Sequence, residues 1–350
     1  MKHITSLLMV SPRYLPAIGG VEKHVHTLAK RLLKRGITVT ILTVSHSSEL
    51  KTMEFIEGIK ILRMPYSYSR VPVLGWLWVL KHIRKFENHD VIHFHDTIPL
   101  LFWGVPLLLL YAFRRVAVTF HGYEKDPVPL RFLLLRKIAS KLISNTLCIG
   151  SFIESIYGIK CRKKTVGAVT QNKIEPRNSS NIAIYLGRLE EDTGILEYIE
   201  AIRILREKHG FKLPIRVIGG GSLRDTIERK SREYGITIEL LGVVGKPDPF
   251  LADSKFCFAS GYLSILEALS NNVPVIGLAK TPLRHKYLLS MKTAGAPISI
   301  QQSAEFVADE MAHLLTNRKL YSKIQVAGRK FTIKMSWEEL ERMYIKMWTR

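Results

Sequence analysis

A single carboxylate, Glu267, lies inside an apolar helical pattern that begins near Gly261 and leads into an apolar strand at 273–277. A buried carboxylate needs hydrogen-bonding or charged partners, and the hydroxyls of a ribose would be suitable donors. An ion pair within the protein, for example with Arg188, is the alternative. Arg188 follows the apolar run 182–186, so its guanidinium is expected at a strand end, where it could bind a diphosphate through two hydrogen bonds.

Two glycine-rich turns stand between a predicted strand and a predicted helix. Gly19 and Gly20 precede an amphipathic pattern, and Gly219 opens the run Gly-Gly-Gly-Ser222. Glycine allows backbone N–H groups at a helix N-terminus to approach a phosphate or a sugar hydroxyl. A simple tight turn is the alternative in both places. For the second turn, Ser222 as the helix N-cap with Asp225 in the first helical turn would suffice.

Three histidines stand at predicted strand ends. His93 and His95 alternate along one strand, which places them on the same side of it, and His121 precedes Gly122 at the end of another. Open α/β sheets bind ligands at such ends, and an imidazole can donate a hydrogen bond to a sugar or an acceptor group. A structural role is the alternative for His121. Because no third run of ligands matches, we expect no metal site.

The elements that position these residues are short apolar runs alternating with helical patterns, which is typical of βαβ units. The length of 350 residues suits two domains. We therefore predict an α/β fold with two Rossmann-like, doubly wound parallel-sheet domains. Helices are expected at 21–35 and 336–347. The expected strands are 4–10, 38–43, 59–64, 90–93 and 116–120, then 182–186, 215–218, 238–241, 256–258 and 273–277, with a polar linker at 174–181.

The net charge of +22 is concentrated in the first half of the chain. Residues 1–176 hold 26 Lys and Arg against 11 Asp and Glu, and the remainder holds 26 against 19, which gives +15 and +7. Such a field suits anionic lipid headgroups, nucleic acid or phosphorylated substrates, with a solubilising surface as the alternative. Aromatic and basic residues are not interleaved as in RNA-binding modules, so we expect no nucleic acid partner.

Two apolar segments bear on membrane contact. Residues 98–113 are uncharged but contain two prolines and fall short of the roughly 20 residues that span a bilayer, so a buried or interfacial helix is expected. Residues 71–85 place Trp76 and Trp78 beside a basic end, as interfacial helices do. A core-facing helix with a solvated end is the alternative for 71–85.

The cysteines and the N-terminus bear on the cellular location. Cys148, Cys161 and Cys257 lack the pair spacing of a metal site, and we expect all three to be reduced. The apolar start of the chain is shorter than the core of a signal peptide and its cleavage site. We therefore expect a cytoplasmic protein, with peripheral contact to an anionic membrane on its cytoplasmic face.

Taken in order, the motifs resemble those of the group 1, family 4 retaining glycosyltransferases of GT-B fold. The resemblance covers nearly the whole chain and extends to 331–338. It implies that residues 1–175 form the acceptor domain, that 176–330 bind the nucleotide-sugar donor, and that 331–350 cross back to the first domain. The motifs are Gly-Gly-Val (19–21), His-x-His (93–95), Phe-His-Gly (120–122), Gly-Arg-Leu (187–189), Gly-Gly-Gly-Ser-Leu (219–223), Leu-Glu-Ala-Leu (266–269) and Val-Pro-Val-Ile-Gly (273–277).

The resemblance also implies roles for single residues. Arg188 would face the donor diphosphate and His121 the transferred sugar, which makes these two the expected catalytic residues. Glu267 would bind the ribose hydroxyls. The other expected donor-binding residues are Gly19, Gly20, Gly219, Leu263 and Ser264, and the residues expected near the acceptor or the sugar are His93, His95 and His121.

Three positions depart from the family pattern. Ala259 replaces the first Glu of the Glu-x7-Glu motif, Thr193 replaces a Lys that normally pairs with the diphosphate, and 167–170 read Gly-Ala-Val-Thr in place of Asn-Gly-Val-Asp. Loss of the Lys contact could cost about 2 to 3 kcal/mol, or roughly one hundredfold in rate.

The sequence therefore predicts a retaining, metal-independent glycosyltransferase without a cofactor. It would move a hexose from a nucleoside diphosphate sugar, its co-substrate, to a lipid-linked or glycan acceptor. The alternative is a catalytically degenerate paralogue that binds a nucleotide-sugar or acts as a scaffold.

Overall fold

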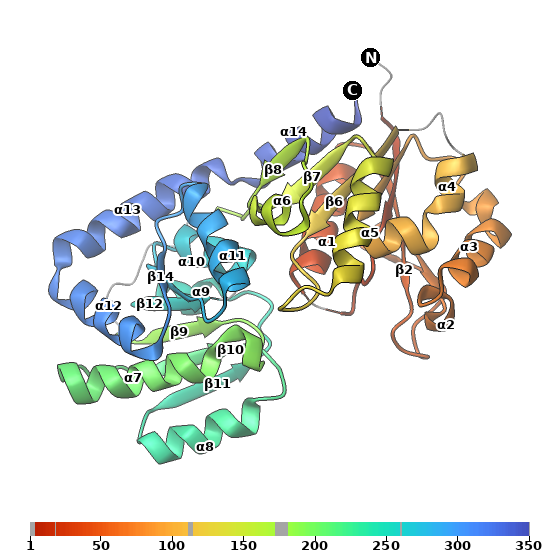
Figure 1. The fold of residues 1–350 in the computed structure, drawn as a ribbon. Helices are drawn as coiled ribbons and strands as arrows, with labels where there is room; N and C mark the ends of the chain where they lie inside the picture. The colour runs from red at the N-terminus through yellow and green to blue at the C-terminus, as the bar shows by residue number, and fades with distance from the viewer. Residues whose placement is uncertain (1–3, 18, 111–114, 172–180, 260, 350) are drawn as a thin grey trace. The chain divides into compact units, whose positions relative to one another are not determined.

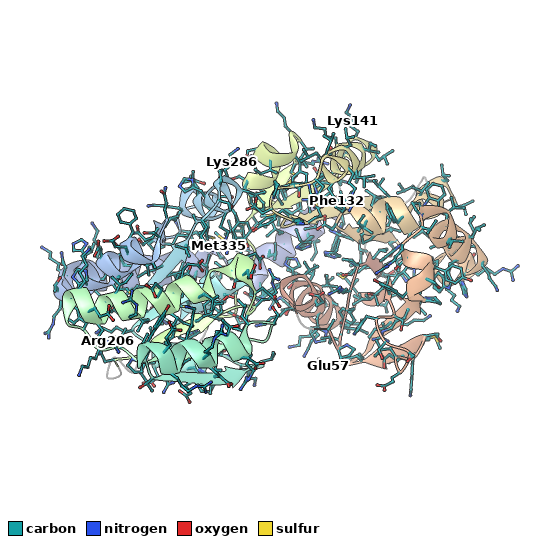
Figure 2. The ribbon with its side chains drawn as sticks, turned by 60° about the horizontal axis from the view of Figure 1, so that its bottom comes forward. Glu57, Phe132, Lys141, Arg206, Lys286 and Met335 are labelled. Carbon is teal, nitrogen blue, oxygen red and sulfur yellow. A yellow bond between two sulfur atoms is a disulfide. The ribbon has the colours of Figure 1, made fainter. Side chains whose placement is uncertain are left out.

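The computed structural model describes residues 4–17, 19–110, 115–171, 181–259 and 261–349 (Figure 1). The chain divides into two compact units: unit 1 comprises Met1–Thr165 and Glu338–Arg350, and unit 2 comprises Val166–Trp337. The sequence suggested divisions near 175 and 330. Residues just after Thr165 group with unit 2 because the Val169 N–H donates to the carbonyl of Met335, 2.9 Å away (Met335 is labelled in Figure 2).

An eight-stranded sheet forms the centre of unit 1, in the order β3-β4-β2-β1-β5-β6-β7-β8. The antiparallel pair β3 and β4 lies at one edge, and the other neighbours are parallel. The five strands expected here are confirmed, whereas β3, β7 and β8 were missed. The strands are β1 (Ser6–Val10), β2 (Thr38–Val44), β3 (Met53–Ile56), β4 (Ile59–Met64), β5 (Val91–His95), β6 (Arg115–His121), β7 (Thr146–Ile149) and β8 (Lys163–Thr165).

The helices of unit 1 follow the apolar pattern of the sequence. The amphipathic helix expected at 21–35 is α1, which buries Val25, Leu28 and Leu32. The helices and turns are α1 (Gly20–Lys34), α2 (Tyr66–Ser69), α3 (Pro72–Lys81), η1 (Ile83–Lys85), the π-helical turn η2 (Pro99–Trp103), α4 (Val105–Leu110), α5 (Leu130–Leu142), α6 (Phe152–Tyr157) and α14 (Trp337–Trp348).

The helix expected at 336–347 is α14. It buries one apolar face, made by Leu340, Tyr344, Met347 and Trp348. The buried carboxylate of Glu341 pairs with Arg31 on α1, 2.7 Å away, and with Arg35, the C-cap residue of that helix. Residues 338–350 group with unit 1.

Unit 2 is built on a parallel six-stranded sheet in the order β11-β10-β9-β12-β13-β14. Its five expected strands are confirmed, and β14 was missed. The strands are β9 (Ala183–Leu186), β10 (Ile215–Ile218), β11 (Ile238–Gly242), β12 (Phe256–Ala259), β13 (Val275–Leu278) and β14 (Ser299–Gln301). The helices are η3 (Glu191–Thr193), α7 (Ile195–His209), α8 (Arg224–Tyr234), α9 (Asp248–Ala252), α10 (Tyr262–Ser270), α11 (Pro282–Thr293), α12 (Ala304–Thr316) and α13 (Arg318–Lys334).

The apolar segment 98–113 is not one helix. It forms η2 and then α4, and residues 111–113 lie outside the described part of the chain. In the segment 71–85, α3 buries Gly75 and Val79. Across the described ranges, we find no helix with the length and apolar character needed to cross a membrane.

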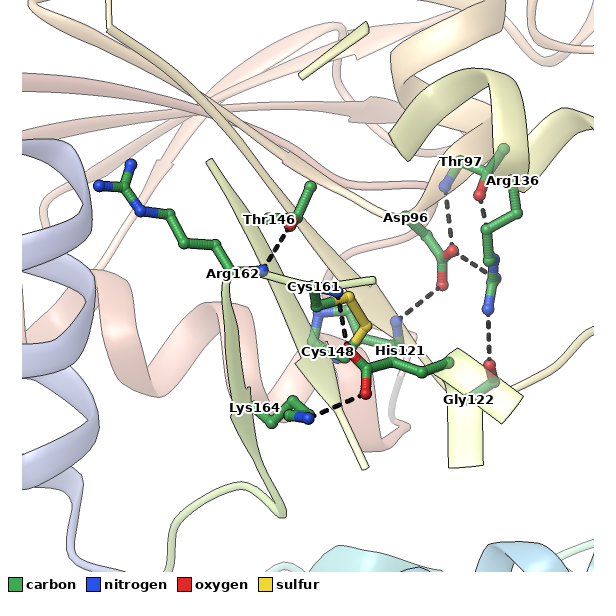
Figure 3. The surroundings of a disulfide bond; sticks show 11 residues. Asp96, Thr97, His121, Gly122, Arg136, Thr146, Cys148, Cys161, Arg162 and Lys164 are labelled. Atoms are coloured by element: carbon green, nitrogen blue, oxygen red, sulfur yellow. Dashed lines mark hydrogen bonds and ion pairs between the residues drawn. A yellow bond between two sulfur atoms is a disulfide. The ribbon is translucent and has the colours of Figure 1, made fainter. Parts of the chain in front are cut away.

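The expectation of three reduced cysteines is wrong for two of them. Cys148 on β7 and Cys161, just before β8, form a disulfide (Figure 3). The two strands are parallel neighbours, and the Arg162 N–H donates to Thr146 Oγ1 across them, 2.9 Å away. This pairing brings the two Cα atoms to 5.9 Å, within the usual range for a disulfide. Cys257 is free and buried, as expected.

Candidate functional site

Four histidines gather inside unit 1. His24 comes from α1, His93 and His95 from β5, and His121 from the end of β6. Strands β5 and β6 are parallel, with His95 opposite Thr119, so that His121 lies one pleat further along. The rings of His93 and His95 stack with centroids 4.7 Å apart, which confirms that these two side chains share one side of the strand.

Hydrogen bonds hold His93 and His24 within the interior. His93 Nε2 is 2.8 Å from Thr119 Oγ1, and His93 Nδ1 accepts from Trp348 Nε1, also 2.8 Å away. His24 Nε2 is 2.9 Å from the hydroxyl of Tyr344. Both ring nitrogens of His93 are thus used within unit 1, although the sequence placed this residue near the acceptor or the sugar.

His121 is partly exposed and is held by His95. His95 Nδ1 lies 3.1 Å from His121 Nε2, while His95 Nε2 is buried without a partner among the described residues. A buried N–H without an acceptor costs more than a buried lone pair without a donor. His95 Nδ1–H therefore donates to His121 Nε2, and His121 carries its proton on Nδ1.

Burial keeps all four rings neutral near pH 7. Loss of hydration lowers the pKa of His24 to about 4. Loss of hydration, and secondarily the neighbouring imidazole of His24, lowers the pKa of His93 to about 3. The pKa values of His95 and His121 are also well below the usual value, first through burial and then through neighbouring histidines, with Arg136 adding to the effect at His121. His121 can therefore offer a hydrogen bond to a ligand but not a positive charge.

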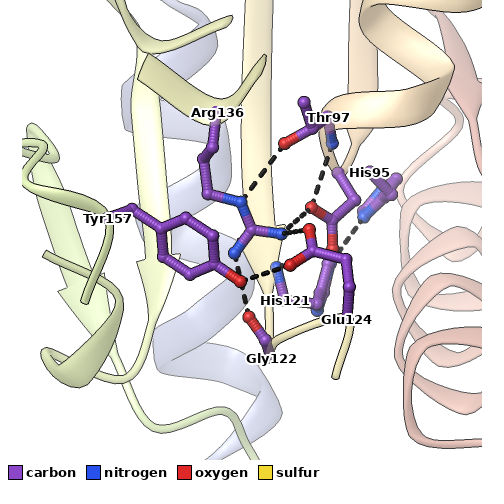
Figure 4. A network of polar contacts seen from close by, with 8 residues as sticks. His95, Thr97, His121, Gly122, Glu124, Arg136 and Tyr157 are labelled. Atoms are coloured by element: carbon purple, nitrogen blue, oxygen red, sulfur yellow. Dashed lines mark hydrogen bonds and ion pairs between the residues drawn. The ribbon is translucent and has the colours of Figure 1, made fainter. Parts of the chain in front are cut away.

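A buried arginine fixes the loop that carries His121 (Figure 4). Arg136 of α5 donates to Asp96 Oδ1 at 2.6 Å, to Glu124 Oε1 at 2.8 Å and to the carbonyl of Gly122 at 2.9 Å. Asp96 Oδ2 in turn accepts from the backbone N–H of His121 at 3.2 Å. The sequence analysis missed this group, because α5 carries three other basic residues and nothing in the sequence marks Arg136 as the buried one.

The aromatic ring of Tyr157 completes the environment of Arg136, beside the carboxylates of Asp96 and Glu124. Its guanidinium lies 4.0 Å from the ring centre of Tyr157, whose hydroxyl donates to Glu124 Oε2. Burial raises the pKa of Asp96, an effect that Arg136 partly offsets. The loop therefore depends on a buried ion group in which each charge has a partner.

In unit 2, the glycine-rich turn packs against the loop of Arg188. A Cβ atom on Gly219, whose φ is +149°, would lie 1.8 Å from the carbonyl oxygen of Gly187. A Cβ on Gly221 would lie 2.4 Å from the carbonyl oxygen of Leu189. Close packing of two loops is thus sufficient to explain these glycines.

The helix after this turn begins later than the sequence predicts. Its N-cap is Leu223, so the assignment of Ser222 as N-cap is wrong, while Asp225 does lie in the first turn. Ser222 instead binds the carboxylate of Glu190. Its hydroxyl donates to Glu190 Oε2, 2.7 Å away, and its backbone N–H donates to Glu190 Oε1.

Arg188 is exposed and Thr193 is not. The Arg188 side chain, 66% exposed, pairs with Asp192 Oδ2 at 2.7 Å. Its partner is therefore Asp192 and not Glu267, the partner that the sequence analysis gave as an alternative. Thr193, at the position of the family's Lys, is buried, and its hydroxyl lies 2.9 Å from the carbonyl oxygen of Arg188. Thr193 therefore braces the loop that presents Arg188.

Helix α10 carries the other residues expected to bind the donor. Gly261 is its N-cap, and Leu263 and Ser264 lie partly exposed in its first turn. Glu267, 9% exposed, follows them by four and three positions, so the three residues share a helix face. Ala259, at the end of β12, is fully buried.

Sheet order brings these parts to one edge of unit 2. Strands β10, β9 and β12 are parallel neighbours, so the loops after them emerge side by side. These loops carry Gly219, Arg188 and the start of α10. The other expected residues, including Gly19 and Gly20 at the start of α1, belong to unit 1.

Gly20 has open space around it, since no described atom lies within 4 Å of where its Cβ would be. A Cβ on Gly19 would meet only the flexible carboxylate of Glu22. Within the part of the chain that the structure describes, no group of three or more His, Cys, Asp or Glu side chains is arranged to hold a metal ion.

Comparison with known families identifies the chain. The model of Glycosyltransferase Family 4 matches residues 18–166, and that of Glycosyl transferases group 1 matches residues 169–331. The chain belongs to the group 1, family 4 glycosyltransferases. It is therefore an enzyme that transfers a sugar.

Related proteins agree with this glycosyltransferase assignment. O-antigen chain mannosyltransferase C of Escherichia coli is 22% identical over 266 residues, which cover 70% of this chain and 69% of that protein. Sucrose-phosphate synthase from Thermosynechococcus elongatus has a TM-score of 0.78 at 14% identity, covering 99% of this chain and 98% of that one. Anabaena HepE in complex with UDP and glucose has a TM-score of 0.76 at 13% identity, covering 99% and 100%. The two structures confirm the GT-B fold.

Proposed function

We propose that this glycosyltransferase is a retaining, metal-independent enzyme that moves a hexose from a nucleoside diphosphate sugar to a lipid-linked or glycan acceptor. One observation carries the proposal. The carboxyl edge of the unit 2 sheet brings Arg188, Gly219 and the N-terminus of α10 onto three adjacent strands. This is where open α/β sheets bind nucleotides.

In the proposed donor complex, α10 binds both ends of the nucleotide. The N–H groups of Leu263 and Ser264, at the positive end of the helix, donate to the diphosphate. Glu267, one turn further on, accepts hydrogen bonds from the ribose hydroxyls. Its carboxylate is largely shielded from water, which strengthens such bonds.

Arg188 supplies the charge that stabilises the leaving group. Its pair with Asp192 is on the surface and therefore weak, so the guanidinium can exchange that partner for the diphosphate at little cost. As the bond between the anomeric carbon and the diphosphate breaks, negative charge grows on the leaving oxygen, and Arg188 and the α10 amides stabilise it. The acceptor hydroxyl attacks from the same face, and its proton passes to the departing diphosphate.

Among the residues of unit 1, we propose that His121 orients the sugar through its Nδ1–H and that Gly20 lets the backbone approach the donor. The neutral state of His121 fits a hydrogen bond to a hydroxyl. His95 would then act by fixing the ring of His121 and not by touching the sugar.

The acceptor would be reached at an anionic membrane. Val73 and Leu77 on α3 are each 55% exposed, although both are apolar, and Lys81, Arg84 and Lys85 follow them in the sequence. An exposed apolar helix face beside basic residues is typical of peripheral membrane binding. We therefore propose that the enzyme binds an anionic membrane peripherally through this helix face.

The experiment that tests this function is incubation of the purified protein with UDP-, GDP- and ADP-hexoses and a lipid-linked acceptor, in the presence of EDTA. Proton NMR of the product should show the anomeric configuration of the donor. An inverted linkage would refute the retaining mechanism, and loss of activity in EDTA would refute metal independence.

A further inference from the structure

A cavity of about 1270 Å³ opens within unit 1. Its walls come from the segments that follow β1, β2 and β4, from η2 and its approach, and from the start of α5. The cavity is larger than most small-molecule pockets, which enclose roughly 300 to 1000 Å³. It therefore has room for part of a large ligand. None of the single residues predicted for the donor or acceptor site lines it, although the apolar segment 98–113 contributes to its wall.

Three arginines from separate segments line this cavity. Arg13 follows β1, Arg70 follows α2, and Arg131 lies in the first turn of α5. No acidic residue is among the lining residues, and none of the three arginines forms an ion pair with a described carboxylate. By contrast, the buried Arg63 and Arg136 of the same unit are paired. The lining thus carries three positive charges without counter-charges, which suits a phosphate group.

One wall of the cavity is apolar. Phe102 and Trp103 of η2 and Phe132 and Leu135 of α5 contribute to it. The guanidinium of Arg131 lies 5.0 Å from the ring centre of Phe132, which is labelled in Figure 2. Charged and apolar surfaces therefore meet in one cavity, and a ligand that fills it has both characters.

The apolar surface continues outward along α5. Leu130, Leu134, Ile138 and Leu142 are at least half exposed and follow one another at intervals of four, which forms one stripe along the helix. Leu130 and Leu134 flank the cavity-lining Arg131 in the sequence. An exposed apolar stripe that starts at a cationic cavity fits the hydrocarbon chain of a ligand whose head lies inside.

We propose that this cavity binds the phosphate or diphosphate of a lipid-linked sugar acceptor, with Arg13, Arg70 and Arg131 on the phosphate and the hydrocarbon chain along the α5 stripe. This inference rests on the proposed function in taking the acceptor to be lipid-linked. The binding itself needs no donor. A water-soluble sugar phosphate would share the phosphate chemistry but not the stripe.

The test is calorimetric titration of the purified full-length protein with farnesyl diphosphate, inorganic diphosphate and farnesol. Farnesyl diphosphate is kept below its critical micelle concentration. Farnesyl diphosphate should bind at least about tenfold more tightly than either of the other two, because only it uses both surfaces. The variants Arg13→Gln, Arg70→Gln and Arg131→Gln should each weaken its binding about tenfold or more. Lys34→Gln removes an equal charge from an exposed position of unit 1 outside the cavity and should leave binding unchanged.

Two further variants distinguish this cavity from the donor site. Leu134→Gln should weaken farnesyl diphosphate but not inorganic diphosphate, since it alters only the stripe. Arg188→Gln should weaken nucleotide binding and leave farnesyl diphosphate unaffected, so a failure of the donor site is seen separately. Unchanged binding in the three cavity variants would overturn the site, and equal affinity for both diphosphates would overturn the lipid assignment.

Discussion

Mild acid should destabilise unit 1 through its buried histidines. In the folded state burial lowers the pKa of His24 to about 4 and of His93 to about 3, whereas an unfolded histidine titrates near 6.5. The unfolded state therefore binds more protons between these values. The stabilisation is complete above about pH 6.5 and is lost as the pH falls towards the folded pKa values.

The size of the effect follows from these pKa values. Between pH 7 and pH 5 the buried, neutral His24 lowers the free energy of unfolding by about 2 kcal/mol, and His93 lowers it by a similar amount. The sum of about 4 kcal/mol is a large part of a typical domain stability of about 5 to 15 kcal/mol. Near pH 5.5 each such histidine contributes a slope of about 1 kcal/mol per pH unit to the free energy of unfolding.

Urea unfolding of the wild type and of His24→Asn between pH 7 and pH 5 measures this slope. Tryptophan fluorescence is a suitable signal, since Trp76, Trp78, Trp103 and Trp348 all belong to unit 1. The variant should be less stable at pH 7, but its free energy of unfolding should fall by about 1 kcal/mol less per pH unit than that of the wild type. An unchanged slope would refute the burial of a neutral His24.

A control separates this effect from other titrations. His46→Asn removes an exposed histidine of unit 1 and should keep the wild-type slope. Asp96 acts in the opposite direction, because burial raises its pKa and the folded state therefore holds its proton more tightly than the unfolded state. The wild type and both histidine variants retain Asp96, so the contribution of Asp96 cancels when their slopes are compared.

Two further substitutions test the loops that present the candidate site, by urea unfolding at pH 7. Gly219→Ala should destabilise unit 2 by about 3 kcal/mol or more, since its Cβ would overlap the Gly187 carbonyl, while Gly245→Ala, in open space, should be nearly neutral. Arg136→Met should lower the free energy of unfolding by about 3 to 5 kcal/mol, because it leaves the carboxylates of Asp96 and Glu124 without their cation. A loss below about 1 kcal/mol would contradict either argument.

The strands that the sequence predicts are those in which apolar residues predominate. The bounds of β4 and β10 agree with the prediction, because both strands begin and end on buried apolar residues, although they contain Lys60, Arg63 and Arg216. The edge strand β8 reads Lys-Lys-Thr and has no such signal. Its absence from the prediction also hid the disulfide, since only the pairing of β7 with β8 brings Cys161 to Cys148.

The candidate site was predictable in its residue types but not in its contacts. Glu267 stood out as one acid in an apolar helix, and the structure buries it. The engagement of His93 by Trp348 joins residues 255 positions apart, which no local pattern records. Thr193 stands where the family has a Lys that pairs with the diphosphate. In the structure its side chain is buried, and its hydroxyl bonds to the carbonyl oxygen of Arg188 and so supports the Arg188 loop.

Binding of the nucleotide tests the central claim most directly. Calorimetric titration with UDP, GDP and ADP should give one nucleotide that binds the wild type, with Glu267→Ala at least about tenfold weaker because ribose hydrogen bonds to a carboxylate are lost. Glu233→Ala, which removes an exposed acid of unit 2, should bind like the wild type. Equal affinity of wild type and Glu267→Ala, or no binding of any of the three nucleotides, would contradict the proposed donor site.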